Sequence, residues 1–205
     1  MGWYEERVLP RIINKVLDNK HTREVRKRVA AELTGDVLEI GFGSGLNLPY
    51  LPPAVKSFKA IDPSGTAAEL ARNRIEASAV PVELVGLDGQ HLPLSDDSVD
   101  AVISTWTLCT IPDATAAIRE LRRVLRPGGT LHFVEHGASD DEGVRRWQDR
   151  LNGFQQKIAG GCNLNRDITG IVEAGGLRVS KLDRYFAPGE PKPFGCLYEG
   201  VAVAD

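Results

Sequence analysis

The stretch V-L-E-I-G-F-G-S-G-L-N at residues 37–47 decides how the rest of the chain is interpreted. Its first apolar residues are typical of a buried parallel strand. Three glycines follow at alternate positions, Gly41, Gly43 and Gly45, so the backbone can turn tightly and a ligand can approach the main chain without meeting a Cβ atom. A helix is expected soon after, with its free N–H groups facing the same ligand. The stretch predicts a nucleotide-type site, with a plain glycine turn as the alternative.

The spacing of the glycines separates two classes of nucleotide site. In the dinucleotide fingerprint G-x-G-x-x-G the third glycine comes five positions after the first, and here Leu46 occupies that position. An acid, Glu39, lies two residues before the first glycine. This spacing disfavours an NAD-dependent oxidoreductase. The form E-x-G-x-G-x-G resembles motif I of the class I S-adenosylmethionine (SAM)-dependent methyltransferases, whose glycine loop passes the methionine and ribose parts of SAM.

The composition is ordinary for one globular α/β domain. The chain has 205 residues, of which 42% are hydrophobic and 26% charged, and its net charge of −3 gives no general signal for nucleic-acid binding. The three cysteines, Cys109, Cys162 and Cys196, are widely spaced and match no disulfide framework or zinc pattern, so we expect buried thiols, a reducing compartment and no metal. No apolar run reaches the roughly 18–20 residues that span a bilayer. We expect a cytoplasmic protein, with peripheral membrane contact left open.

The N-terminal segment is expected to be helical. Residues 3–18 carry one apolar stripe, and Thr22 is expected to cap a second helix that runs to Leu33. We treat residues 1–34 as an extension or lid and residues 35–205 as the main domain. Three interpretations of the extension remain open. It is a packed helical pair with a solvated basic face, a lid over the substrate that uses Trp3 and Tyr4, or a basic amphipathic helix on an anionic membrane.

Two further acids follow predicted strands. Asp62 lies some twenty residues beyond the glycines, where α/β nucleotide sites place the carboxylate that binds ribose hydroxyls, and a helix N-cap is its alternative role. Asp88, in a D-G turn, follows the third predicted strand, and plain turn chemistry is its alternative. Because the carboxyl ends of parallel strands share one edge of a sheet, both acids are expected beside the glycine loop.

The order of the elements predicts a seven-stranded sheet whose last strand is antiparallel. Helices are expected to alternate with the strands, and residues 126–129 (R-P-G-G) are expected to end one helix and lead into the fifth strand. The expected strands are 36–41, 55–61, 82–85, 98–104, 130–135, 177–186 and 194–204, and the expected helices after the extension are 64–78, 113–126, 140–159 and 168–174.

Further motifs strengthen and narrow the resemblance. L-R-R-V-L-R-P-G-G-T-L at 121–131 resembles methyltransferases of quinone biosynthesis. T-L-C-T at 107–110, F-V-E-H at 133–136 and G-C-N-L-N-R at 161–166 resemble the methyltransferase-like small-molecule methyltransferases, whose membrane-bound animal members methylate alkyl thiols. The likeness covers roughly residues 36–180 and departs at the N-terminus. It implies a Rossmann-like class I methyltransferase fold, with SAM as methyl donor and S-adenosylhomocysteine as product.

The resemblance also implies a set of site residues. His136 is the candidate base for a hydroxyl or thiol, and a hydrogen-bonded strand-end histidine is its alternative. Cys162 is interpreted as a packing residue of its loop rather than a nucleophile, while Asn163 and Arg166 either orient the substrate or cap the next helix. The residues expected to bind SAM are Glu39, Gly41, Gly43, Gly45, Asn47, Asp62, Pro63, Asp88, Gly89 and Thr105, and those expected near the substrate are Trp3, Tyr4, Trp106, Cys162, Asn163 and Arg166.

The predicted function is methyl transfer to a small, apolar acceptor such as a thiol or a phenol. Two alternatives use the same fold, a quinone C-methyltransferase and a phospholipid N-methyltransferase. A third is a SAM-binding module without catalysis, which the intact glycine loop, Asp62 and Asp88 disfavour.

Overall fold

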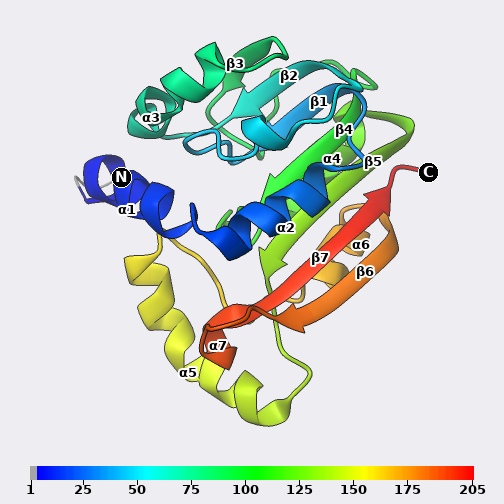
Figure 1. Cartoon of the computed structure of the whole chain (residues 1–205). Coiled ribbons are helices and arrows are strands. Elements are labelled where there is room, and N and C mark those ends of the chain that lie inside the picture. Colours follow the sequence, from blue (N-terminus) through cyan, green and yellow to red (C-terminus); the bar gives the residue numbers. More distant parts are fainter. Residues whose placement is uncertain (1–3) are drawn as a thin grey trace.

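Seven strands form one sheet, in the order β3-β2-β1-β4-β5-β7-β6, in the computed structural model, which describes residues 4–205 (Figure 1). The pairs from β3 to β5 are parallel, whereas β7 runs antiparallel to both β5 and β6. The predicted sheet and its antiparallel last strand are therefore confirmed. The strands are β1 (Gly35–Ile40), β2 (Val55–Ile61), β3 (Val82–Gly86), β4 (Val99–Thr105), β5 (Leu125–His136), β6 (Arg178–Phe186) and β7 (Cys196–Val203).

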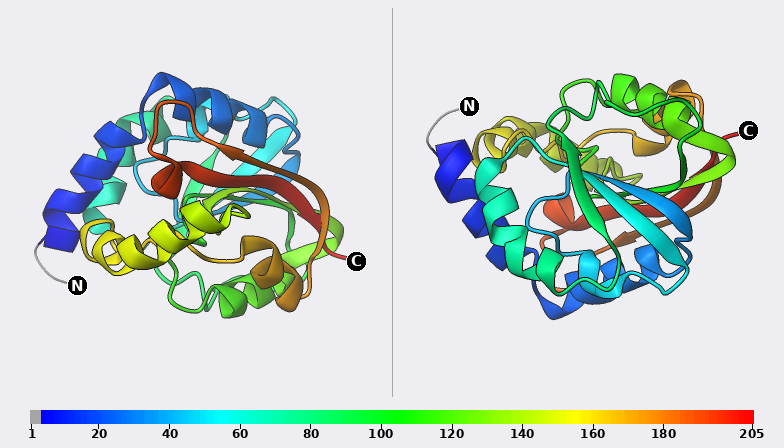
Figure 2. Two further views of the ribbon diagram at one scale, coloured as in Figure 1. Left: turned by 90° about the horizontal axis from the view of Figure 1, so that it is seen from below. Right: turned by 90° about the horizontal axis from the view of Figure 1, so that it is seen from above.

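Helices cover both faces of this sheet. Figure 2 shows α2 and α3 on one side and α4, α5 and α6 on the other. A π-helical turn, η1 (Tyr4–Val8), leads into the first α-helix, and a 3-10 turn, η2 (Leu48–Tyr50), follows the glycine loop. The α-helices are α1 (Leu9–Val16), α2 (Lys20–Ala30), α3 (Gly65–Glu76), α4 (Ala114–Val124), α5 (Glu142–Ile158), α6 (Ile168–Ala174) and α7 (Lys192–Gly195).

The core has two layers because successive side chains of a strand point to opposite faces. Leu38 of β1 packs in a buried cluster with Leu121 of α4, whereas Val37 packs with Val25 and Val29 of α2. Complete burial of one such side chain contributes about 1.5–3 kcal/mol. The two layers hold the carboxyl ends of the parallel strands in register along one edge.

Several element boundaries differ from the prediction; α2, for example, ends at Ala30 and not at Leu33. Asn19, not Thr22, caps α2, and Thr22 is the third helical residue of a reciprocal capping box, in which each side chain accepts from the other residue's N–H. Residues 126–129 lie within β5 and interrupt its pairing with β4, because Leu125 pairs with Val99 and the next paired residue is Thr130, opposite Ala101. They therefore form an irregularity within the strand and not a loop before it. Residues 192–195 form α7, so the last strand begins later than predicted.

The N-terminal helix α1 lies between α3 and α5 (Figure 1). Its apolar stripe is only partly covered, since Leu9 is buried while Ile12, Ile13 and Val16 are exposed. Trp3, a predicted substrate residue, lies outside the described residues. Within residues 4–205, every helix is too short or too polar to cross a membrane.

Candidate active site

The glycine loop after β1 has the backbone that its sequence predicts. Gly41, Gly43 and Gly45 have φ angles of 72°, 55° and 75°, in the left-handed region that favours glycine. A Cβ atom at Gly41 would overlap the side chain of Thr107, so this glycine lets the loop pack against the segment after β4. A Cβ atom at Gly43 would meet nothing within 4 Å. The main chain at Gly43 is therefore open to a ligand.

Asp62 at the end of β2 is held against this loop. One carboxylate oxygen accepts from the Gly43 N–H at 2.7 Å and the other from the Ser64 N–H at 2.9 Å. Ser64 itself caps α3, so the alternative role of Asp62 as the N-cap is not what the structure shows. Burial raises the pKa of Asp62. Each oxygen keeps a further lone pair for a ligand hydroxyl, with the exposed Pro63 alongside.

Asp88 follows β3 at the same edge of the sheet and is exposed. Its carboxylate accepts from the Gln90 N–H at 2.8 Å and lies 3.1 Å from Nδ1 of His91. The hydrogen bond from Gln90 is the main cause of a lowered pKa at Asp88. Both contacts belong to a tight turn. Gly89 packs against Ile40 so closely that a Cβ atom would overlap it, which holds the turn beside the end of β1.

A buried polar network connects the glycine loop to the end of β4. Asn47 Nδ2 donates to Glu39 Oε1 at 2.6 Å and to Thr105 Oγ1 at 3.1 Å. Arg26 Nη1 donates to Asn47 Oδ1 at 2.9 Å and to Thr105 Oγ1 at 2.7 Å. Burial raises the pKa of Glu39 to about 8. Within the described part of the chain, Glu39 Oε2 and Arg26 Nε are buried without a hydrogen-bond partner.

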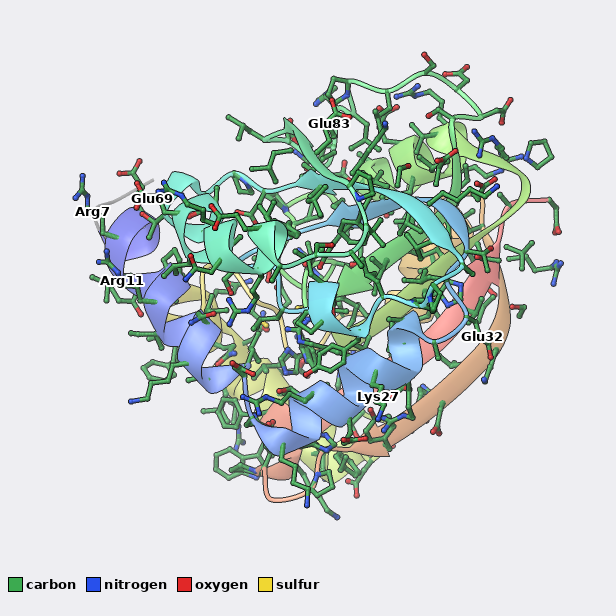
Figure 3. All side chains as sticks on the ribbon, turned by 45° about the horizontal axis from the view of Figure 1, so that its top comes forward. Arg7, Arg11, Lys27, Glu32, Glu69 and Glu83 are labelled. Atoms are coloured by element: carbon green, nitrogen blue, oxygen red, sulfur yellow. The ribbon has the colours of Figure 1, made fainter. Side chains whose placement is uncertain are left out.

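Arg26 is a residue of this site that the sequence analysis did not identify. A solvated basic face is one of the three interpretations of the N-terminal extension, but Arg26 is only 4% exposed, whereas its neighbour Lys27 points outward (Figure 3). Burial lowers the pKa of Arg26 to about 10, so the guanidinium remains charged at neutral pH. The sequence feature that could have indicated burial of Arg26 is its position three residues before Val29, because residues three apart share a helix face and Val29 is buried.

Trp106, a predicted substrate residue, lies directly after β4 and is partly buried. Its φ angle is 55°, and a non-glycine residue in this region costs on the order of 1–2 kcal/mol. Its N–H donates to the Val134 carbonyl at 2.8 Å, and its ring lies 4.9 Å from the Arg26 guanidinium carbon. These contacts hold the indole beside the polar network.

The side chains of Cys109, His136 and Cys162, which come from three separate segments, meet near the loop after β4. His136 Nδ1 lies 3.4 Å from Cys162 Sγ and 3.9 Å from Cys109 Sγ, and the two sulfurs are 3.5 Å apart. The hydrogen bond between the thiols lowers the pKa of Cys162 and raises that of Cys109 well above its usual range. Burial works against a charged imidazole, but the contact with Cys109 raises the pKa of His136. Both thiols are buried, and His136 is partly exposed.

Asn163 and Arg166, two predicted substrate residues, join two loops. Asn163 donates through its side chain and its N–H to the Cys109 carbonyl, at 2.9 and 2.8 Å. Arg166 donates to two carbonyls of the loop after β4, each at 2.6 Å. Neither residue caps α6, since Asp167 does so. Their observed role is to fix loop 160–167 against the loop after β4.

Glu135 is a second residue that the sequence analysis did not identify. It is completely buried at the end of β5. Its carboxylate accepts from Ser104 Oγ at 2.8 Å, from the Thr107 N–H at 3.0 Å and from the Cys109 N–H at 3.1 Å. This carboxylate therefore sets the backbone that carries Cys109.

The N-terminal segment contacts both sides of the site. Asn14 Oδ1 of α1 accepts from Ser44 Oγ in the glycine loop at 2.6 Å and from Arg74 Nη1 at 3.2 Å. Tyr4, a predicted substrate residue, donates through its hydroxyl to the Ile158 carbonyl of α5 at 3.0 Å. The segment thus covers the glycine loop and touches the helix that precedes loop 160–167.

Two surface hollows, of about 420 and 270 Å³, lie at the other edge of the sheet. The larger is lined by residues near the starts of β4 and β5, such as Asp100 and Arg126, and the smaller by residues of α2, β6 and β7, such as Arg28, Lys181 and Glu199. Ligands of open α/β sheets bind outside the carboxyl ends of the strands. We therefore locate the site where the glycine loop, the acids and the cysteine–histidine cluster converge.

Comparison with known proteins agrees with this geometry. Residues 38–133 match a family model described as a methyltransferase domain. The chain is 32% identical over 156 residues to human thiol S-methyltransferase TMT1A, covering 74% of this chain and 64% of the relative's length. It is 33% identical over 144 residues to phosphatidylethanolamine N-methyltransferase of Cereibacter sphaeroides, covering 68% of this chain and 70% of that protein.

A solved structure of a SAM-dependent methyltransferase from Thermotoga maritima has the same fold. The TM-score is 0.70 at 19% identity, with 99% of each chain covered, so this likeness bears on the fold alone. Together with the sequence relatives and the family model, it leads to one conclusion: this chain belongs to the SAM-dependent methyltransferases.

Proposed function

We propose that this protein transfers a methyl group from SAM to a small, apolar acceptor, and that the acceptor is a thiol. The observation that carries the proposal is the pair of unpartnered buried atoms beside the glycine loop, Glu39 Oε2 and Arg26 Nε. An acceptor oxygen and a donor nitrogen match the ammonium and the carboxylate of an amino acid, and SAM has such an end. When bound, SAM supplies a methyl group that its sulfonium activates for transfer.

The residues around this pair have the chemistry to hold the rest of the donor. Asp62 keeps lone pairs for ribose hydroxyls, and the open main chain at Gly43 has no Cβ atom in the way. Asp88 with Gly89 at the end of β3 is the candidate contact for the base. Asn47 and Thr105 orient the buried pair. Because the donor is already activated, the chain's main task is to position the acceptor and keep water away from it.

A thiol acceptor is favoured by the residues after β4 and β5. Trp106 supplies an apolar wall, and His136 is the candidate base for the acceptor's proton. A thiol needs little help to ionise, because its usual pKa of about 8.5 is close to neutral. The relative named as a thiol S-methyltransferase supports the same acceptor, although this chain spans only 64% of its length.

A phospholipid head-group amine is the second candidate acceptor. The relative named phosphatidylethanolamine N-methyltransferase favours it. So does the exposed apolar surface of α1 and α5, on which Ile12, Val16, Trp147 and Phe154 are exposed. Peripheral contact of these two helices with a lipid surface accompanies this alternative, and flotation with phospholipid vesicles tests it. A quinone acceptor is the third candidate, and a SAM-binding module without catalysis is the least favoured.

The first experiment is a methyl-transfer screen with labelled SAM against small thiols, phenols, quinols and lipid extracts. We expect label in a thioether. Label only in lipid would replace the thiol with the second candidate. Silence across the panel, with SAM bound in calorimetry, would leave a binding module. His136→Ala should lower turnover more than SAM affinity, and unchanged turnover would remove it as a base.

The donor site is tested with two glycines in matched conformations. Gly43 and Gly128 have φ angles of 55° and 78°, and a Cβ atom at either meets nothing within 4 Å. Valine at either position costs about 1–2 kcal/mol of backbone strain. Gly43→Val should abolish SAM binding in calorimetry, while the control Gly128→Val, at the opposite edge, keeps it. Asp62→Ala should weaken binding as well, and unchanged affinity in both site variants would remove the donor site from this edge.

A further inference from the structure

The cluster of Cys109, His136 and Cys162 has the composition of a metal site. Its three ligand atoms lie within 4.8 Å of one another and come from the loop after β4, the end of β5 and the loop after α5. Two thiolates and one imidazole suit Zn²⁺, and three protein ligands with one open position are typical of catalytic zinc. The sequence predicted no metal, because 53 residues separate the two cysteines and no zinc spacing is present.

The distances within the cluster fit a tetrahedral ion. Zinc bonds of about 2.3 Å to sulfur and about 2.0–2.1 Å to nitrogen, at tetrahedral angles, place two sulfurs about 3.8 Å apart and a sulfur and a nitrogen about 3.6 Å apart. The structure has 3.5 Å between the sulfurs and 3.4 and 3.9 Å from sulfur to Nδ1. A disulfide would instead require a sulfur separation of about 2.05 Å, and all three cysteines are free.

We propose that Cys109, Cys162 and His136 bind a zinc ion at the acceptor side of the methyl-transfer site, and that the fourth ligand of this ion is the acceptor thiol.

Hydrogen bonds hold together the backbone segments that carry the three ligands. Glu135 accepts from the Cys109 N–H at 3.1 Å and directly precedes His136 in β5. Asn163, which follows Cys162, donates twice to the Cys109 carbonyl. The three segments that carry the ligands are therefore joined by hydrogen bonds that do not involve the Sγ and Nδ1 atoms themselves.

A buried carboxylate beside the cluster favours a cation, and it acts against the opposing charge of Arg166, whose guanidinium also influences Cys162. Glu135 is completely buried, and its recorded partners are neutral hydroxyl and N–H groups. Among the described residues it forms no ion pair with a lysine or an arginine. An uncompensated carboxylate in the interior lowers the energy of a nearby positive ion.

The role of the ion in catalysis rests on the proposed thiol methylation. The acceptor R–SH binds the zinc as R–S⁻ and releases its proton to solvent, because coordination to zinc deprotonates a thiol. The sulfur then attacks the methyl carbon. The new S–CH₃ bond forms as the sulfonium S–CH₃ bond breaks, and S-adenosylhomocysteine leaves with the electron pair. With zinc bound, His136 would be a ligand, and this role would replace that of candidate base for the acceptor's proton.

The test measures metal before it measures activity. The full chain is loaded with Zn²⁺ under a phosphine reductant, freed of unbound metal, and analysed by mass spectrometry for zinc. We expect about one zinc per chain, as for a site of three protein ligands. Cys109→Ser, Cys162→Ser and His136→Ala should each lose it. Cys196→Ser is the matched control, since this third buried cysteine lies outside the cluster and its variant should retain the ion.

Cobalt provides a second measurement that does not depend on the variants folding. Co²⁺ in the wild-type site should give sulfur-to-metal charge-transfer absorption, and an acceptor thiol should shift its visible bands. Wild-type protein that binds neither metal, or that forms a Cys109–Cys162 disulfide in place of metal binding, would overturn the site. Shifted cobalt bands without methyl transfer to thiols would instead refute the proposed function and leave the site standing. Methyl transfer that is unaffected by Cys162→Ser would overturn the role of the ion.

Discussion

The two halves of the candidate site are built in different ways. The donor half consists of the glycine loop, Glu39 near the end of β1, and the acids after β2 and β3, and most of its residues lie within three positions of a strand end. The acceptor half consists of the loop after β4, the end of β5 and loop 160–167, and its key contacts join residues 26 to 53 positions apart. A donor that is the same for a whole family requires a local motif, whereas an acceptor site can be assembled from distant loops.

The two halves meet at a strained junction. Glu39 of the donor half is held without a partner for Oε2, and Trp106 of the acceptor half has a left-handed backbone. Arg26 contacts residues of both halves, Asn47 and Thr105. Unpaired buried groups destabilise the free protein and become favourable when a ligand pairs with them. This comparison predicts that ionisation of Glu39 changes stability and donor binding in opposite directions.

The largest expected effect is the pH dependence caused by Glu39. Burial raises its pKa in the folded protein to about 8, whereas an unfolded glutamate titrates near 4.3. Between these values only the folded state keeps the proton, so the free energy of unfolding falls as pH rises, by on the order of 5 kcal/mol in total. Chemical denaturation from pH 5 to pH 9 should show this decline in the wild type, and Glu39→Gln should flatten it.

Donor binding should show the opposite trend. The ammonium of SAM favours the ionised carboxylate, so below about pH 8 binding releases a proton and affinity rises about tenfold per pH unit. Calorimetry in buffers with different ionisation enthalpies measures this proton. Glu39→Gln should bind SAM weakly and without proton release. A wild type that binds SAM with no proton exchange would break the proposed pairing of Glu39 with the donor.

The second effect concerns Arg26, which links the halves. Arg26→Ala removes the partner of Asn47 and Thr105 and leaves buried polar atoms unpaired, which should lower the free energy of unfolding by about 3–5 kcal/mol. SAM binding should be lost with it. The control is Lys27→Ala, on the exposed side of the same helix, with an expected change within about 0.5 kcal/mol. Equal stability of the two variants would mean that the junction does not connect the halves.

The same division explains how much the sequence predicts. The strand order, the glycine loop and the positions of Asp62 and Asp88 follow from local spacing, because a strand end, a tight turn and an acid occur within a few residues. The sequence also places His136 and Cys162 in separate loops. It does not predict their contact with Cys109, since that depends on how loop 160–167 packs against the loop after β4.

Arg26 and Glu135 were missed for a related reason. Each has a charged side chain, and charged residues are usually solvated, so the composition of a basic helix or a strand end favours a surface position. Burial of either is decided by the partners it finds, Asn47 and Thr105 for Arg26 and three hydrogen-bond donors for Glu135. Those partners come from β4, from the glycine loop and from the loop after β4, which only the folded sheet brings together.

The smallest expected effect tests whether the N-terminal helix belongs to the donor half. Asn14 Oδ1 accepts from Ser44 Oγ at 2.6 Å and is the recorded side-chain link between α1 and the glycine loop. Asn14→Ala removes about 1 kcal/mol of interaction, which corresponds to roughly fivefold weaker SAM binding if α1 steadies the loop. The control is Lys15→Ala, the exposed neighbour, which should bind SAM as the wild type does. If Asn14→Ala leaves SAM affinity unchanged but raises the KM of the acceptor, then α1 belongs to the acceptor half, because Tyr4, in the turn that precedes α1, donates to α5 beside loop 160–167.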